Sequence, residues 1–141
     1  MTQSQIPVSH PSPYTEEEIS HLVHAFYTKA RKDPSLGPIF EAHVTDWDAH
    51  FVQMINFWSG NLLGTNRFRG APMPKHLAIP ELSPQLFERW LQIFKQTTQE
   101  LDNPALAQQA TAMANRIAER LWMGYQMTHS PDKPMVALRE V

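Results

Sequence analysis

The stretch Trp47-Asp-Ala-His-Phe-Val-Gln-Met-Ile-Asn-Phe-Trp-Ser-Gly-Asn-Leu-Leu63 decides the fold class. Its large side chains recur at steps of three and four, the spacing of one helix face: Trp47, His50, Phe51, Met54, Ile55, Trp58 and Leu62. Gly64 follows, and glycine suits the position just after a helix end. We therefore predict a helix from about Trp47 to Leu63.

The segment before this helix carries a start signal and a second apolar stripe. Thr15-Glu-Glu-Glu18 has the pattern of a capping box, and apolar residues follow it at helical spacing as far as Ala30. Asp33-Pro34 ends that helix, because a residue that precedes proline disfavours the helical conformation. The stretch Leu36-Gly-Pro-Ile-Phe40 is expected to hold no more than a short turn.

Prolines divide the rest of the chain into three further helical pieces. Residues 65–74 are predicted to form a loop, and a short helical piece follows from Lys75 to Ile79. Ser83-Pro84 and Asn103-Pro104 each place an N-cap residue before a proline, and each opens an amphipathic helix. Because no segment sustains the alternation typical of a β-strand, the chain is predicted to be all-α.

Composition excludes several kinds of site and partner. The chain has 141 residues, enough for one core, and no cysteine, which rules out disulfides, thiolate metal sites and thioether-linked haem. Its net charge of −2, without a Lys/Arg cluster, disfavours nucleic acid or a membrane surface as a partner. We expect a cytoplasmic protein with a flexible arm at 1–14, one domain at 15–128 and a tail at 129–141.

Four side chains with polar or ligating atoms fall where the pattern predicts an enclosed interior: Tyr27, His50, His76 and Trp90. Each alone has an ordinary explanation, such as a core tyrosine bonded to a backbone carbonyl or a loop histidine on the surface. Together they direct four polar atoms toward one interior. His76 lies between Pro74 and Pro80, in a segment too short for a packing helix, and such a segment suits a single axial metal ligand.

Short motifs follow one another in a specific order over residues 19–121: Phe26-Tyr27, Asp33-Pro-x-Leu-Gly-Pro-Ile-Phe40, Trp47-x-x-His50, Phe57-Trp58, Leu62-Leu63-Gly64, Gly70-x-Pro72, His76-x-x-x-Pro80 and Phe87-x-x-Trp90. In this order they resemble the truncated haemoglobins, specifically the third group, found mainly in bacteria. The other two groups carry Gly-Gly pairs that this chain lacks. The resemblance implies a shortened globin fold, in which two crossed helix pairs (two-over-two) surround a non-covalent b-type haem.

The resemblance also implies roles for individual residues. His76 corresponds to the proximal iron ligand. The distal pocket that would face the gas ligand comprises Tyr27, His50, Trp90 and Met54. Haem contacts are implied for Phe40, Phe57, Trp58, Arg69 and Lys75, with Arg67 as a further cation for the propionates. One departure is Phe68, where relatives often carry tyrosine.

The implied function is the binding of O₂, CO or NO. Hydrogen-bond donors aimed at the gas ligand favour the bound state, which predicts high affinity and slow release. The main alternative is a redox enzyme, an NO dioxygenase or a peroxidase-like protein, served by an external reductase. A third hypothesis is a helical interaction module without haem, in which His76 is a surface residue.

Overall fold

The computed structural model describes residues 12–80 and 82–141, and its regular structure there is entirely helical. The elements are α1 (Glu16–Ala30), α2 (Gly37–His43), α3 (Trp47–Leu63), α4 (Pro72–Leu77), α5 (Pro84–Gln99) and α6 (Pro104–His129). No strand occurs among these described residues, which confirms the predicted all-α class. None of the described helices combines the length and the apolar character that a bilayer crossing needs.

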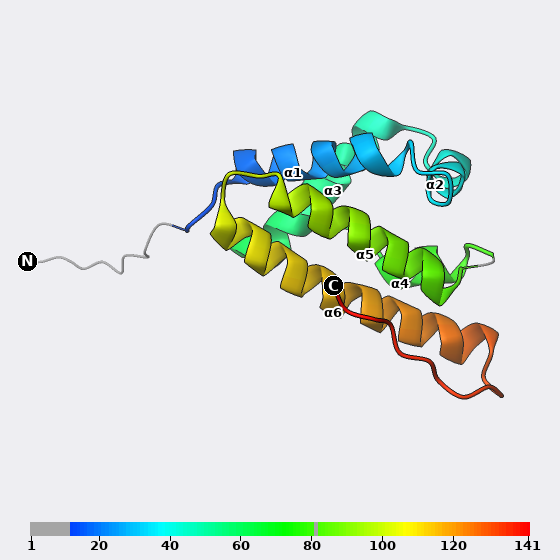
Figure 1. Ribbon diagram of the computed structural model, residues 1–141. Coiled ribbons are helices and arrows are strands. Elements are labelled where there is room, and N and C mark those ends of the chain that lie inside the picture. Colours follow the sequence, from blue (N-terminus) through cyan, green and yellow to red (C-terminus); the bar gives the residue numbers. More distant parts are fainter. Residues whose placement is uncertain (1–11, 81) are drawn as a thin grey trace, which may run out of the picture.

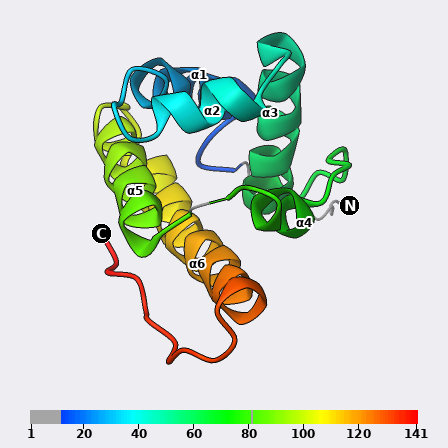
Figure 2. The same ribbon diagram turned by 90° about the vertical axis from the view of Figure 1, so that its right-hand side faces the viewer.

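The helices form two crossed pairs. Helix α1 packs on α3 and helix α5 packs on α6, and the pairs meet where α1 crosses α5 and α3 reaches α6. Figure 1 shows α5 and α6 running side by side below α1, and Figure 2 shows α3 running steeply on the right, across from α5. This is the predicted two-over-two arrangement of a shortened globin fold.

The ends of the long helices follow the capping signals in the sequence. The Thr15 hydroxyl accepts a hydrogen bond from the Glu18 N–H (3.1 Å) and the Thr15 N–H donates to the Glu18 carboxylate (2.9 Å), so the capping box is complete. Ser83 and Asn103 cap α5 and α6 through their side-chain oxygens. Gly64 ends α3 at φ 78°, a left-handed conformation that favours glycine.

The short helices differ from the prediction. Residues 37–43 form helix α2, where only a turn was expected, and α4 begins at Pro72 instead of Lys75. Both predictions were wrong for one physical reason. A proline in the first helical turn needs no N–H partner there, so it starts a helix as readily as it ends one.

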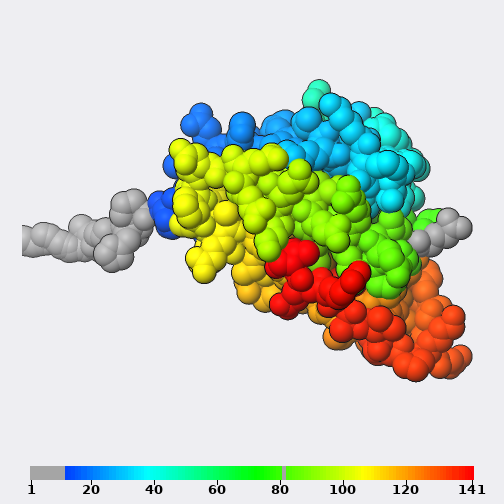
Figure 3. All heavy atoms as spheres, in the orientation of Figure 1, coloured from blue at the N-terminus to red at the C-terminus, as the bar shows by residue number. Residues whose placement is uncertain are grey.

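Both termini of the described chain pack against the helices. Residues 1–11 of the expected arm lie outside the described residues, but Tyr14 is buried and its hydroxyl donates to the Leu62 carbonyl (3.3 Å). Residues 130–141, here called the C-terminal strap, run back along α5 and α6 (Figure 3). The Trp122 indole donates to the Val136 carbonyl (2.8 Å), and Leu138 is buried.

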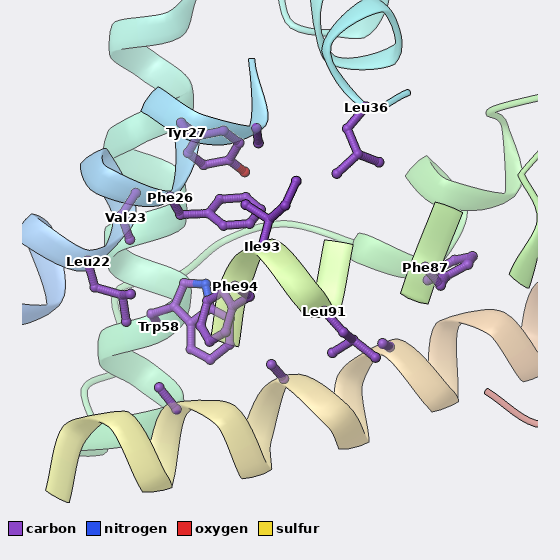
Figure 4. Close-up of a cluster of buried hydrophobic side chains, with 14 of the residues drawn as sticks. Leu22, Val23, Phe26, Tyr27, Leu36, Trp58, Phe87, Leu91, Ile93 and Phe94 are labelled. Atoms are coloured by element: carbon purple, nitrogen blue, oxygen red, sulfur yellow. The ribbon is translucent and has the colours of Figure 1, made fainter. Parts of the chain in front are cut away.

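An aromatic stack forms the centre of the core (Figure 4). The ring of Phe94 on α5 lies parallel to Trp58 of α3, at 4.9 Å between centroids, and parallel to Trp90, at 5.2 Å. Phe26 of α1 packs edge-on against Trp90 at 5.4 Å. Because this stack joins both helix pairs, it anchors the wall of the cavity described next.

Candidate functional site

A cavity of about 500 Å³ opens beside this core, within the range of about 300–1,000 Å³ usual for small-molecule sites. Nearly all the residues predicted for the site line it: Tyr27, Phe40, His50, Met54, Phe57, Trp58, Lys75, His76 and Trp90. They come from α1, α2, α3, α4 and α5. In both ribbon views α1 and α2 lie toward one side of the molecule and α4 toward the other (Figures 1 and 2).

Tyr27 and His50 form a hydrogen-bonded pair in the cavity wall. The Tyr27 hydroxyl lies 2.8 Å from Nε2 of His50, so a residue on α1 meets one on α3. The Tyr27 side chain is 6% exposed, and its ring packs edge-on against Phe40 at 5.3 Å. Burial raises the pKa of Tyr27 far above its ordinary value, so the hydroxyl keeps its proton.

His50 is held in its neutral form. Its pKa lies below the ordinary value because burial disfavours the charged imidazole and the Lys75 ammonium repels it. A neutral imidazole protonated at Nδ1 accepts a hydrogen bond from the Tyr27 hydroxyl at Nε2. An imidazole protonated at Nε2 donates to the Tyr27 oxygen instead, and the Tyr27 proton is then free for a ligand in the cavity.

The Trp47 ring packs against both members of the Tyr27–His50 pair, a role that was not predicted from the sequence. Its ring packs edge-on against Tyr27 (5.4 Å) and His50 (5.6 Å), and the Arg31 guanidinium lies 4.0 Å from its ring centre. Its buried indole nitrogen has no hydrogen-bond partner among the described residues. The motif Trp47-x-x-His50 was the available signal, since residues three apart share a helix face.

His76 projects from α4 with one ring nitrogen already engaged. Its Nδ1 lies 2.7 Å from the Pro72 carbonyl oxygen, an acceptor, so Nδ1 carries the proton and Nε2 keeps its lone pair. Metal-ligating histidines usually have this arrangement. Within residues 12–80 and 82–141 no group of three or more His, Cys, Asp or Glu side chains gathers to hold a metal ion. Nε2 of His76 is therefore the ring nitrogen that could bind a metal ion.

Of the three cations expected near the haem edge, the structure brings only Lys75 to the cavity. Arg69 turns back onto its own loop and donates to the carbonyls of Asn66 (2.6 Å) and Phe68 (2.9 Å). Arg67 forms an ion pair with Glu16 at the start of α1. The direction of the 64–71 loop has no local sequence signal, so the sequence could not indicate which partners these two cations have.

Much of the remaining lining is apolar and was not predicted as part of the site: Leu36, Ile39, Val44, Leu82, Leu86, Ile117 and Leu121. In the sequence such residues are indistinguishable from ordinary core positions. Leu36 and Leu82 lie just before the proline-containing starts of α2 and α5, and that position is the signal that could have indicated them. Leu86, Ile117 and Leu121 lie on the long helices α5 and α6 and had no such signal.

Comparisons with known proteins identify the family of the chain. The sequence profile of the bacterial-like globins matches residues 15–122. The group 3 truncated hemoglobin of Campylobacter jejuni is 35% identical over 116 residues, which covers 76% of this chain and 91% of that protein. The crystal structure of group III truncated hemoglobin from Campylobacter jejuni superposes with a TM-score of 0.75 at 32% identity, covering 86% of this chain and 96% of that one.

Proposed function

Because the chain belongs to the bacterial-like globin family, and within it resembles the third group of truncated haemoglobins, we propose that it holds a b-type haem through His76 and binds a diatomic gas. One observation carries the proposal. A cavity of about 500 Å³ has a histidine with a free Nε2 on α4, and a Tyr–His pair on α1 and α3.

The residues of the cavity fit a haem. Its lining is mainly apolar and aromatic, which suits the porphyrin face, and Phe40, Phe57 and Trp58 supply rings for that contact. Lys75 is the cation available for a propionate. When bound, haem would supply an iron that one protein side chain holds and that binds a small gas. We assign Nε2 of His76 to the protein ligand.

The polar residues on α1, α3 and α5 act on the gas. Tyr27 keeps its proton, and His50 is neutral and either accepts a hydrogen bond from the Tyr27 hydroxyl or donates one to it, which leaves the hydroxyl proton free for a ligand in the cavity. Trp90 adds an indole N–H in the same lining. A donor that faces a charged acceptor contributes about 1.5–3 kcal/mol, so two donors from this trio would give high affinity and slow release of O₂.

The redox activity considered from the sequence, turnover of NO or peroxide with an external reductase, stays a prediction. No feature of the described residues favours it over simple gas binding. CO and NO are expected to bind at the same position as O₂, since all three are small enough for the same polar pocket.

The test is the absorption spectrum of the reconstituted protein, ferric and then reduced with CO, compared with that of His76→Gly. We expect a Soret band in the wild type that shifts with CO. In His76→Gly the band should be weakened or lost, and added imidazole should restore it by occupying the vacated position.

His21→Gly makes the same substitution at an exposed position of α1, away from the cavity, and should leave the Soret band unchanged. Absence of a Soret band in the reconstituted wild type would contradict the proposal and favour the haem-free interaction module. A His76→Gly spectrum identical to that of the wild type, without imidazole, would reject His76 as the ligand.

A further inference from the structure

Helix α4 and the segment that follows it pack on α6 through three residues, here called the α4 seat: Gly124, Tyr125 and His129. The side chain of Met73 packs so closely on Gly124 that a Cβ there would lie 2.7 Å from its sulfur. Nε2 of His129 lies 2.9 Å from the Leu77 carbonyl oxygen. These contacts flank His76 on both sides, at residues 73 and 77.

Tyr125 makes the most specific contact of the α4 seat. Its hydroxyl donates to the Ile79 carbonyl (2.7 Å) and accepts from the Leu82 N–H (3.2 Å). One side-chain oxygen thus bonds to both described parts of the connection from α4 to α5, residues 78–80 and 82–83. The side chain is only 5% exposed, so both of these backbone groups would lose a partner if the hydroxyl were removed.

The ring of Tyr125 is itself fixed in place. It stacks on His129 at 4.2 Å between centroids and on Trp122 at 6.0 Å. Trp122 is bonded to the carbonyl of Val136 in the C-terminal strap, and Gln126 engages both the N–H and the carbonyl of the same residue. These contacts fix the Tyr125 ring, so its hydroxyl keeps a defined position facing the segment after α4.

Helix α4 needs such support because it has little stability of its own. It spans six residues and its N-cap, Ala71, makes no side-chain cap bond. The His76 imidazole is bonded to Pro72 of the same helix, so the ring moves with α4. The position of Nε2 therefore depends on how α4 is held from outside.

We propose that Tyr125 is a positioning residue for His76: by fixing Ile79 and Leu82 it sets where the imidazole meets the haem iron. This inference rests on the proposed function, since it presupposes that His76 is the iron ligand. It assigns Tyr125 no contact with haem or gas, and Tyr125 is not among the residues that line the cavity.

The test is Tyr125→Phe, which keeps the ring and its stacking and removes only the hydroxyl. We expect the variant to fold and bind haem, with a shifted or broadened iron–histidine stretching band in the resonance Raman spectrum of the ferrous protein. Haem transfer to an acceptor globin should be faster on the order of ten-fold. Tyr14→Phe is the matched control, because Tyr14 is similarly buried but bonds to Leu62, remote from α4.

A second background separates positioning from general stability. In His76→Gly rescued with imidazole the ligand is no longer attached to α4. Adding Tyr125→Phe there should leave the iron–imidazole band unchanged, whereas a general loosening of the fold would alter it in both backgrounds.

The outcomes are distinguishable. A wild-type protein with a Soret band and an iron–histidine band that is identical in Tyr125→Phe would overturn this inference and leave the proposed function intact. An effect of Tyr125→Phe that persists with free imidazole, or that Tyr14→Phe reproduces, would also overturn it. A wild type without haem absorbance would contradict the proposed function itself.

Discussion

At the scale of single residues, the chemistry of the cavity depends on where one proton points. Tyr27 always carries a proton because burial raises its pKa, and His50 is neutral because burial and Lys75 lower its pKa. Two neutral groups therefore lie 2.8 Å apart, and the tautomer of His50 decides which of them donates. A gas ligand in the cavity would favour the tautomer that leaves the Tyr27 hydroxyl free to donate to the ligand, and the rate at which the ligand dissociates would report the strength of that hydrogen bond.

Tyr27→Phe tests that hydrogen bond, because it keeps the ring and its packing on Phe40. We expect O₂ to dissociate about 10 to 100 times faster, which corresponds to one hydrogen bond to a charged acceptor. Stopped-flow replacement of O₂ by CO measures the rate. Tyr14→Phe, a buried tyrosine that bonds to Leu62, should dissociate O₂ at the wild-type rate. Unchanged rates in both Tyr27→Phe and Trp90→Phe would rule out slow release by polar contacts.

The pKa of His50 predicts how stability depends on pH. Its folded pKa lies below 6.5, so the unfolded chain binds a proton as pH falls through 6.5 while the folded chain does not. The contribution of His50 to the free energy of unfolding is therefore complete above pH 6.5 and falls below it, by at most about 1.4 kcal/mol per pH unit. His50→Gln should lose less stability than the wild type between pH 7.5 and 5.5 in urea unfolding of the haem-free protein. A variant that loses as much would show that His50 titrates normally.

At the scale of helices, sequence patterns predicted the long elements better than the short ones. The bounds of α3 match the prediction because two sequence signals agree: the apolar stripe runs to the end of the helix, and Gly64 follows it. In the structure Gly64 adopts the left-handed conformation that ends α3. The extents of α2 and α4 were predicted wrongly because proline favours the first turn of a helix but interrupts a helix elsewhere, and the sequence alone did not show which case applied. Tyr125 had no signal at all, since its partners are backbone groups at Ile79 and Leu82, which any residue type would provide.

Two glycines in helices should respond oppositely to alanine. A Cβ at Gly37, where α2 begins, would lie 2.5 Å from the Arg31 carbonyl oxygen, a backbone atom that cannot turn aside. A Cβ at Gly124 would meet only the flexible tip of Met73. Overpacking costs about 1–3 kcal/mol, whereas alanine gains up to about 1 kcal/mol over glycine within a helix. Gly37→Ala should therefore destabilise the protein by at least about 1 kcal/mol more than Gly124→Ala in denaturant unfolding, and equal effects would contradict this.

At the scale of the whole molecule, stability is unevenly distributed. Helices α5 and α6 pack along their lengths, and the C-terminal strap covers both, with Arg139 bonded to Glu88 and Leu138 buried. Helices α2 and α4 are short and border a cavity of about 500 Å³. A ligand that fills this cavity gives α2 and α4 packing contacts that they otherwise lack. Ligand binding should therefore increase the local order of these two helices.

Removal of haem tests this coupling. We expect the haem-free protein to melt about 10 °C lower than the holoprotein, because a ligand present at 100 times its dissociation constant adds about 2.7 kcal/mol to the free energy of unfolding.

Amide hydrogen exchange should become faster in α2 and α4, which border the cavity, and change little in α5 and α6 away from it. The His76→Gly protein with imidazole should recover protection in α2 but less in α4, since the bond from α4 to the haem is missing. Uniform loss of protection over all helices would show instead that the fold responds to haem as a single cooperative unit.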